Sequence, residues 1–245
     1  MQQKTYSTKE IAQMSGVHPN TVRLYEAWGF IARAERKSNH YRVFNDDHLY
    51  QMKLARIALP GPYPLDGKLV QQLVKEFALK NIASASYLAR EYLNKVESEK
   101  ARALQALTIL DHWFERKTGD KNKIVVKGRK RAAQEIGISV DALRTWERNG
   151  LFAIGKDIQS HLVYSEWDIE KIKVIRLLRN CGYSISSLFR VFGDEENLEE
   201  KPSILLLLPD NDEDFFYVTD LFLHFLEDHG TRAHKIITMI EAYEQ

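Results

Sequence analysis

Two short stretches of this sequence carry side chains suited to binding a nucleic acid. Residues 21–30 read TVRLYEAWGF and residues 142–151 read ALRTWERNGL. Each stretch places an arginine, an aromatic residue and a glutamate in close succession, and each ends in a glycine followed by an apolar residue. A cationic, aromatic helix that ends at glycine is typical of a small DNA-reading module, and this chain contains such a stretch twice.

The similarity extends well beyond these two stretches. AQMSG at residues 12–16 is matched by AQEIG at residues 133–137, at the same separation along the chain. One residue is then lost, so that Tyr164 matches Phe44. A match in register over roughly sixty residues is an internal repeat, which predicts two copies of one structural unit.

The first copy begins with the signals of two short helices. Ser7 and Glu10 have the spacing of a capping box, in which each side chain accepts from the backbone N–H of the other. Gly16 then turns the chain, and Pro19 suits the first position of a second helix, which ends at Gly29. Two helices joined by a tight turn predict a helix-turn-helix, whose second helix enters the major groove of DNA.

Residues 33–44, RAERKSNHYRVF, predict a two-stranded wing beside this helix pair. Their centre favours a turn, and the aromatic and β-branched residues that follow it favour a strand. Further helices are expected from Asn45 onward and again at residues 65–79, with a break at the prolines between them. The second copy follows the same plan.

Two longer helices are expected outside these modules. Residues 84–117 contain no glycine or proline and carry an apolar heptad seam, so they predict one helix on the order of 50 Å long. An acidic loop at 194–213 is expected to precede an amphipathic helix at 214–245, which Gly230 is expected to bend or interrupt.

We therefore predict a mainly α fold with two winged helix-turn-helix modules, each followed by a long helix. The modules are expected at residues 1–80 and 122–193. Because a lone amphipathic helix must bury its apolar stripe, the two long helices are expected to pack antiparallel as a pseudo-dimer within one chain. The sequence leaves open that two chains associate as a homodimer instead.

The charge of the chain is unevenly distributed. Its net charge is only +1. Both repeats are nevertheless basic, and the strongly acidic residues 193–245 cancel their positive charge in the total. Basic surfaces attract nucleic acid, and an acidic segment is better suited to face solvent or protein. Double-stranded DNA is therefore the expected partner of both repeats.

Other functional classes find little support in the sequence. The single cysteine, Cys181, excludes an internal disulfide and argues against a cysteine metal cluster. His224, His229 and His234 are each turned by about 140° from the last on a helix, so no metal site is expected. No catalytic constellation is found, so we expect neither an enzyme nor a cofactor. Without a signal peptide or a membrane-spanning stretch, the protein is expected in the cytoplasm.

The repeat resembles the MerR (mercury-resistance regulator) family of bacterial transcription regulators. The resemblance rests on TKEIAQMSGVHPNTVRLYEAWGF and SNHYRVFNDDHL in the first copy and on GISVDALRTWERNGL in the second. The second wing departs from the pattern, because His161 and Leu162 stand where the first wing has Tyr41 and Arg42. Strong phosphate contact by the second wing is therefore in doubt.

This resemblance implies a role at promoters. Members of the family are homodimers that bind two-fold symmetric operators, and they distort promoter DNA so that RNA polymerase can use an overlong spacer. This chain resembles a tandem form in which one polypeptide supplies both DNA modules, so its operator is expected to be imperfect and asymmetric. RNA polymerase is an expected further partner. The effector domain or cysteine cluster that usually follows the long helix is not found in this sequence.

The repeat also predicts which side chains face DNA. Arg23 and Arg144 are expected to contact phosphate, which positions the protein without reading sequence. Tyr25 and Trp146 either donate to phosphate or pack in the core. The full set of predicted DNA contacts is His18, Asn20, Thr21, Arg23, Tyr25, Lys37, Tyr41, Arg42, Arg129, Lys130, Arg131, Ser139, Asp141, Arg144, Thr145, Trp146 and His161.

Base reading is expected at the start of each second helix. Asn20 can pair with adenine, whereas Asp141 at the matching place accepts from cytosine, unless both only support the helix start. The basic residues 129–131 are expected to compensate for the weakened second wing.

The leading interpretation is a sequence-specific transcription regulator. Two alternatives stay open: an architectural or excisionase-like protein that bends DNA, and a protein-interaction scaffold that has lost DNA binding. Loss of affinity on Arg23→Ala would argue against the scaffold.

Overall fold

The computed structural model describes residues 4–59, 67–116, 119–194, 198, 200–207 and 222–243. These residues form eleven helices and four short strands in two two-stranded sheets, so the predicted mainly α fold is confirmed. The chain divides into two compact units, Met1–Ser98 with Leu226–Gln245, and Glu99–Phe225. Each unit contains one copy of the repeat and part of each long helix.

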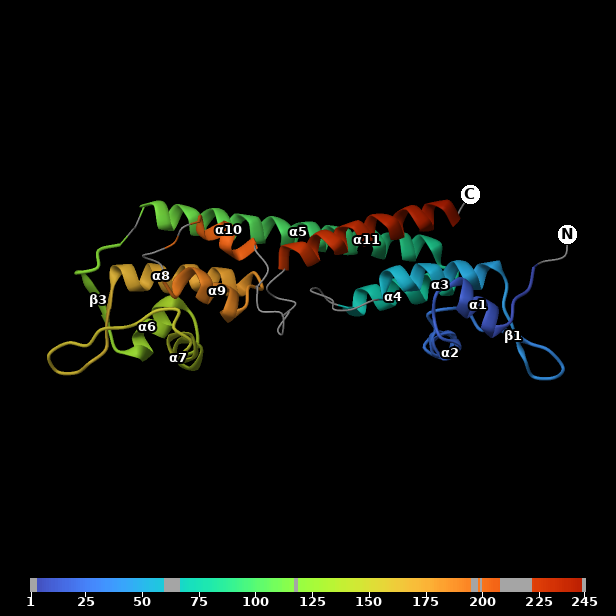
Figure 1. Cartoon of the computed structure of the whole chain (residues 1–245), viewed down its shortest axis with the longest axis horizontal. Coiled ribbons are helices and arrows are strands. Elements are labelled where there is room, and N and C mark those ends of the chain that lie inside the picture. Colours follow the sequence, from blue (N-terminus) through green and yellow to red (C-terminus); the bar gives the residue numbers. More distant parts are fainter. Residues whose placement is uncertain are drawn as a thin grey trace. The chain divides into compact units, whose positions relative to one another are not determined.

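Figure 1 labels most of these helices and strands. The elements of the first unit are α1 (Thr8–Met14), α2 (Pro19–Ala27), β1 (Glu35–Arg36), β2 (Arg42–Val43), α3 (Asp46–Ala58), α4 (Gly67–Ala78), the first part of α5 (Ile82–Arg116) and most of α11 (Phe222–Tyr243). Those of the second unit are the rest of α5, β3 (Ile124–Lys127), α6 (Arg129–Ile136), α7 (Val140–Arg148), β4 (Val163–Ser165), α8 (Glu166–Asn180), α9 (Ile185–Phe192) and α10 (Pro202–Leu207).

The first copy folds as a helix-turn-helix. Helix α1 begins at the predicted capping box, where Ser7 Oγ accepts from Glu10 N and the Glu10 carboxylate accepts from Ser7 N. The hydrogen bond from Ser7 N lowers the pKa of Glu10. Gly16 has a φ of 62° and turns the chain into α2, and Ile11 and Val22 are fully buried beneath the two helices.

The first wing and the helices after it close this module. Strands β1 and β2 pair antiparallel as a hairpin, with Arg36 opposite Arg42. The buried side chain of Gln51 on α3 accepts from Ala32 N at 2.7 Å and donates to Ala78 O at 3.2 Å. One amide thus connects α3 to the chain after α2 and to the end of α4.

Helices α5 and α11 run antiparallel in the first unit. Arg90 on α5 pairs with Glu241 at 2.9 Å, and farther along α5 the Tyr92 hydroxyl bonds to His229 Nδ1. Both Tyr92 and His229 are buried. Within this unit, the stripes of the two long helices therefore cover each other, as the sequence predicts.

The prediction that Gly230 bends or interrupts the C-terminal helix is wrong as to an interruption. Helix α11 continues through Gly230 from Phe222 to Tyr243. Gly230 is buried against α5, where an added β-carbon would lie 3.8 Å from Val96 Cγ1. The packing on α5 offsets the low helix propensity of glycine, which costs only about 1 kcal/mol.

The second copy repeats the helices of the first, but its strands lie at different places along the chain. Strand β3 pairs antiparallel with β4 over three residue pairs, directly before the helix-turn-helix of α6 and α7. Gly137 and Gly150 end these two helices with φ values of 74° and 75°. Trp113 of α5 stacks on Trp167 of α8 with ring centroids 4.5 Å apart, which joins the module to the long helix.

Residues 194–213, expected to form an acidic loop, contain the short helix α10. Asp111 on α5 accepts from Ser203 N at 2.9 Å and from Ser203 Oγ at 2.6 Å, and Leu206 is buried. The apolar run that follows Pro202 forms a helix that packs against α9, and Asp111 of α5 supplies its polar partner near the helix start. The remainder of this predicted loop from residue 208 onward, and residues 214–221 of the predicted C-terminal helix, lie outside the described residues.

The described residues contain no helix with the length and apolar character needed to cross a membrane. The same residues bring together no group of three or more His, Cys, Asp or Glu side chains that could hold a metal ion.

Candidate nucleic-acid interface

The first recognition helix, α2, presents a polar face to solvent. His18 precedes the helix and its Nδ1 accepts from Asn20 N at 3.2 Å, which fixes the helix start. Asn20 Oδ1 accepts from Arg23 Nη1 at 2.9 Å, and both side chains are exposed. Thr21 is half-buried beside them. Three of the predicted DNA contacts therefore form one hydrogen-bonded group at the start of α2.

The predicted aromatic contacts lie in the core of their modules. Tyr25 is 9% exposed and meets the edge of Phe30, with ring centroids 5.6 Å apart. Trp146, at the matching place on α7, is 7% exposed. Of the two roles that the sequence left open for these rings, the structure favours core packing.

The first wing forms one wall of a basic depression of about 690 Å³. The start of α1 and Arg23 of α2 line it as well. Tyr41 projects from the wing with 72% of its surface exposed, and Lys37 is exposed next to it. The cationic side chains that line this depression are Lys9, Arg23, Lys37 and Arg42.

Glu26 connects this wing to the recognition helix. Its Oε1 accepts from Ala34 N at 3.1 Å, just before β1, and its Oε2 accepts from Arg42 Nε of β2 at 2.5 Å. The Glu26 side chain is only 7% exposed. Because both ends of the wing bind one carboxylate of α2, the wing and the recognition helix are held together.

The second recognition helix, α7, has the same polar face with different residues. Ser139 Oγ accepts from Ala142 N at 3.0 Å and begins the helix. Arg144 Nη1 lies 3.4 Å from Asp141 Oδ1, which repeats the pairing of Arg23 with Asn20. Thr145 is half-buried, and Arg144 and Asp141 are exposed.

The glutamate of α7 has a partner on another element. Glu147 stands where Glu26 stands in the first module, but its carboxylate pairs with Arg129 at the start of α6. A depression of about 600 Å³ lies beside this pair. The described residues that line it all belong to α6 and α7, so the wing contributes no wall here. Lys130 and Arg131 are exposed on the first turn of α6.

The second wing is poor in positive charge. A single bridge between Lys156 and Leu162 joins its two sides. Asp157 begins its turn and accepts from His161 N at 2.9 Å, a hydrogen bond that lowers the pKa of Asp157 most strongly. Lys127 donates to the same carboxylate, and Ile158 at the tip is fully exposed.

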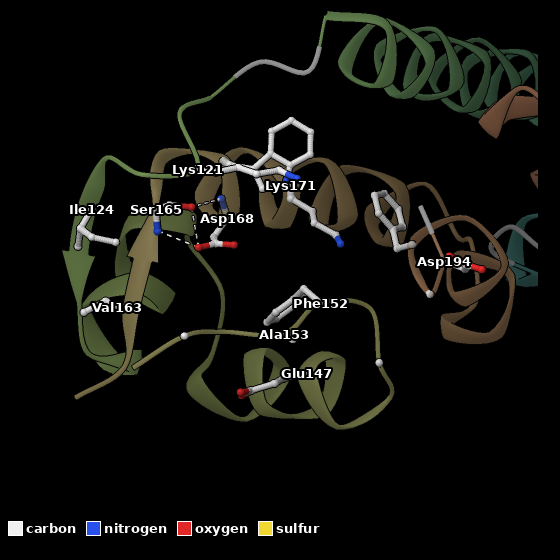
Figure 2. A pocket seen from close by; sticks show the side chains of 15 residues that line it. Lys121, Ile124, Glu147, Phe152, Ala153, Val163, Ser165, Asp168, Lys171 and Asp194 are labelled. Atoms are coloured by element: carbon white, nitrogen blue, oxygen red, sulfur yellow. Dashed lines mark hydrogen bonds between the residues drawn. The ribbon is translucent and has the colours of Figure 1, made fainter. Parts of the chain in front are cut away.

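A larger depression of the second module, of about 700 Å³, lies between α8 and the loop that follows α7 (Figure 2). Phe152 and Ala153 of that loop and Lys171 of α8 line it, and the Lys171 side chain extends toward Phe152 (Figure 2). The Asp168 carboxylate accepts from Ser165 N and Oγ at 2.8 and 2.7 Å in the same view. The described residues that line it include none of the predicted DNA contacts.

A family model described as "MerR HTH family regulatory protein" matches residues 6–66 and 130–192, about half of the chain. The chain belongs to the MerR family. The two matched regions coincide with the two helix-turn-helix modules, so the predicted tandem form is confirmed.

One curated relative supports this assignment. An "Uncharacterized HTH-type transcriptional regulator" of Haemophilus influenzae is 29% identical to this chain over 80 residues. The match covers 30% of this chain and 58% of the relative, so it spans little more than half of that protein. No solved structure matches significantly.

Two groups of residues in this MerR-family protein escape prediction from the sequence. Glu26 and Glu147 are visible in the repeated motif, but nothing in the motif names their partners. Lys9 and Arg148 line the two basic depressions, and only their charge could have suggested this.

Proposed function

We propose that this MerR-family regulator binds promoter DNA with both modules of one chain, on an operator that has two unlike half-sites. One observation carries the proposal. Arg23 and Arg144 occupy the same exposed position on the second helix of two helix-turn-helix modules, and each lines a basic depression. Arginines in this position can neutralise phosphates at two sites on one duplex.

The partners of these arginines support unlike half-sites. Asn20 carries an amide that can both donate and accept, which suits adenine in the major groove. Asp141, in the same relation to Arg144, only accepts when ionised, which suits the amino group of cytosine. We therefore expect the two halves of the operator to differ at the matching base pair.

Membership of the MerR family supports the remainder of the proposal. Through its two long helices, one chain would act as a pseudo-dimer, and binding would distort the duplex in favour of RNA polymerase. The protein would act in the cytoplasm as a regulator and would catalyse no reaction.

Light scattering combined with footprinting tests this proposal. The mass of the complex with a duplex from the protein's own promoter region is measured, and the protected bases are mapped. We expect one chain per duplex and two adjacent protected half-sites. Two chains per duplex would contradict the pseudo-dimer and favour an ordinary homodimer or an architectural protein.

Arg23→Ala and Arg144→Ala serve as paired controls. Each is expected to weaken binding about tenfold and to lower the salt dependence by about one phosphate contact. Each should weaken protection of one half-site only. Absence of binding by the wild type at low salt would exclude the DNA role and favour a protein scaffold.

A further inference from the structure

We infer that Arg129 is a positioning residue that takes over, in the second module, the part that wing residue Arg42 plays in the first. Its partner Glu147 thereby fixes α7 against α6, and the second wing is left out of the DNA contact. This inference rests on the proposed function, because its consequence is a difference between two DNA-binding modules.

Comparison of the two repeats shows that equivalent glutamates have arginine partners at different positions. Glu26 and Glu147 are equivalent, but the counterpart of Arg42 in the second wing is Leu162. The counterpart of Arg129 in the first module is Thr8, the first residue of α1. Each module therefore has one arginine for this glutamate, supplied by the wing in one case and by the first helix in the other.

In each module the glutamate carboxylate needs an arginine partner, either at the position of Arg42 or at that of Arg129. The side chain of Glu147 is 24% exposed and that of Glu26 is 7% exposed, so both are withdrawn from water. A partly buried carboxylate without a partner is costly. With Leu162 in the wing, an arginine at position 129 restores the missing partner.

The site of Arg129 is otherwise a poor place for a cation. Gly128 precedes α6 without a side-chain cap, and Arg129, Lys130 and Arg131 follow in succession. Positive charges are unfavourable at the N-terminal end of a helix dipole, where α1 instead has Ser7 and Glu10. The ion pair with Glu147 offsets this for Arg129, whereas Lys130 and Arg131 remain exposed toward solvent.

The moved pair also accounts for the second wing. Released from α7, the wing is closed by the Lys156–Leu162 bridge and is held to the chain before α6 by Lys127, which pairs with Asp157, and by Gly128 N, which donates to Leu162 O at 2.8 Å. Its turn carries Asp157 where the first wing has Lys37. The depression beside α7 is lined by α6 and α7 alone among the described residues. The phosphate contacts of the second module are thus assigned to Arg144, Lys130 and Arg131.

The inference is tested by moving the arginine partner of Glu147 from α6 to the second wing. Affinity for the promoter duplex is measured by fluorescence anisotropy across a salt series, for the full chain and three variants. These are Arg129→Thr, which installs the residue of the first module, Leu162→Arg, and the double variant that carries both. Arg131→Thr is the matched control, because it removes an equal charge from the same helix turn.

We expect Arg129→Thr to weaken binding roughly tenfold without changing the salt slope, because no phosphate contact is lost. Arg131→Thr should lower that slope by about 0.9. In the double variant, the arginine introduced by Leu162→Arg would meet Glu147 from the wing. Affinity should then return to within about threefold of the wild type, with new backbone protection beside the second half-site.

Two results would overturn the inference. One is a salt slope that falls by about 0.9 in Arg129→Thr, which would make Arg129 a direct phosphate contact. The other is a double variant that folds, by circular dichroism, and binds no better than Arg129→Thr. Should Arg129→Thr unfold, Arg129→Thr with Glu147→Gln removes the uncompensated charge and permits the same salt series. If the wild type itself does not bind at low salt, the proposed function fails first.

Discussion

The two modules of this protein place their β-structure at opposite ends of the same fold. In the first, the wing is a paired hairpin, and the described residues before α1, residues 4–7, contribute only the Tyr6–Phe44 bridge. In the second, β3 before α6 pairs with β4 over three residue pairs, and the wing has a single bridge. One repeat can thus brace its recognition helix from the wing or from the N-terminal strand and helix.

The modules also join their long helices by different chemistry. In the first, Asp47 on α3 accepts from Tyr243 of α11 at 2.9 Å and from Lys80 Nζ at 2.6 Å. In the second, the counterpart of Asp47 is Trp167, which stacks on Trp113 of α5. A polar junction and an aromatic junction respond differently to mutation and to acid, so the comparison can be tested.

Truncation at the aromatic junction should give the largest effect. Trp113→Ala is expected to destabilise the second unit by about 3–5 kcal/mol, because a buried indole is lost. Tyr243→Phe in the first unit removes one hydroxyl and should cost about 0.5–1.5 kcal/mol. Urea unfolding gives the size of each change, and hydrogen exchange shows which unit loses protection. Equal losses in the two units would contradict this contrast.

Helix-level features of these modules are predictable from sequence because their signals are local. The capping box of Ser7 and Glu10 and the turn at Gly16 each involve neighbours along the chain, and both form as predicted. The partner of Glu147 is not predictable in this way. Arg129 is 18 residues away from it in sequence and is followed by Lys130 and Arg131, and only the folded geometry selects among these three cations.

Packing likewise decides features that a single helix leaves open. Tyr25 and Trp146 lie on helices with one buried and one exposed face, and the motif alone fits both. Gly230 weakens a helix in isolation but lies within a continuous helix that packs on α5 in the folded unit. These residues depend on the surface opposite them, which the sequence of their own helix does not contain.

Removing the two equivalent glutamates gives the next largest effect. Glu26→Ala should cost about 2–3 kcal/mol, because Arg42 and Ala34 N both lose a nearly buried acceptor. Glu147→Ala should cost about 1 kcal/mol, since its ion pair is more exposed to solvent. Urea titrations of both variants, assigned to units by hydrogen exchange, measure the ratio. A larger loss for Glu147→Ala would show that the second brace is the stronger one.

Acid should weaken the first module through the helix start at α3. His48 Nδ1 accepts from Asn45 N at 3.2 Å, and burial lowers the pKa of His48 below its ordinary value of 6.5. The unfolded chain therefore binds a proton before the folded one does, so stability decreases as the pH falls below about 6.5. The second module has Asp168 at this place, which accepts from Ser165.

Hydrogen exchange of α3 and α8 between pH 7 and pH 5, corrected for intrinsic rates, should show a greater loss of protection in α3. His48→Gln keeps the cap geometry without a titrating group and should remove the difference. A decline that persists in His48→Gln would assign the acid sensitivity to another group.

The smallest expected effect compares the two wings on DNA. Tyr41 is largely exposed and lines the basic depression of the first module, so Tyr41→Ala should weaken binding about threefold by loss of one hydrogen bond to phosphate. His161, its counterpart, lies 3.7 Å from Asp157 and outside the depression of the second module. His161→Ala should therefore change affinity by less than about twofold.

Anisotropy titrations at one salt concentration and one pH compare these two variants directly. An equal or greater loss for His161→Ala would mean that the second wing contacts DNA even with Leu162 and Asp157 in place. The ion pair of Arg129 with Glu147 would then be an additional brace for α7, because the wing would have kept its DNA contact without the arginine that holds the first wing in position.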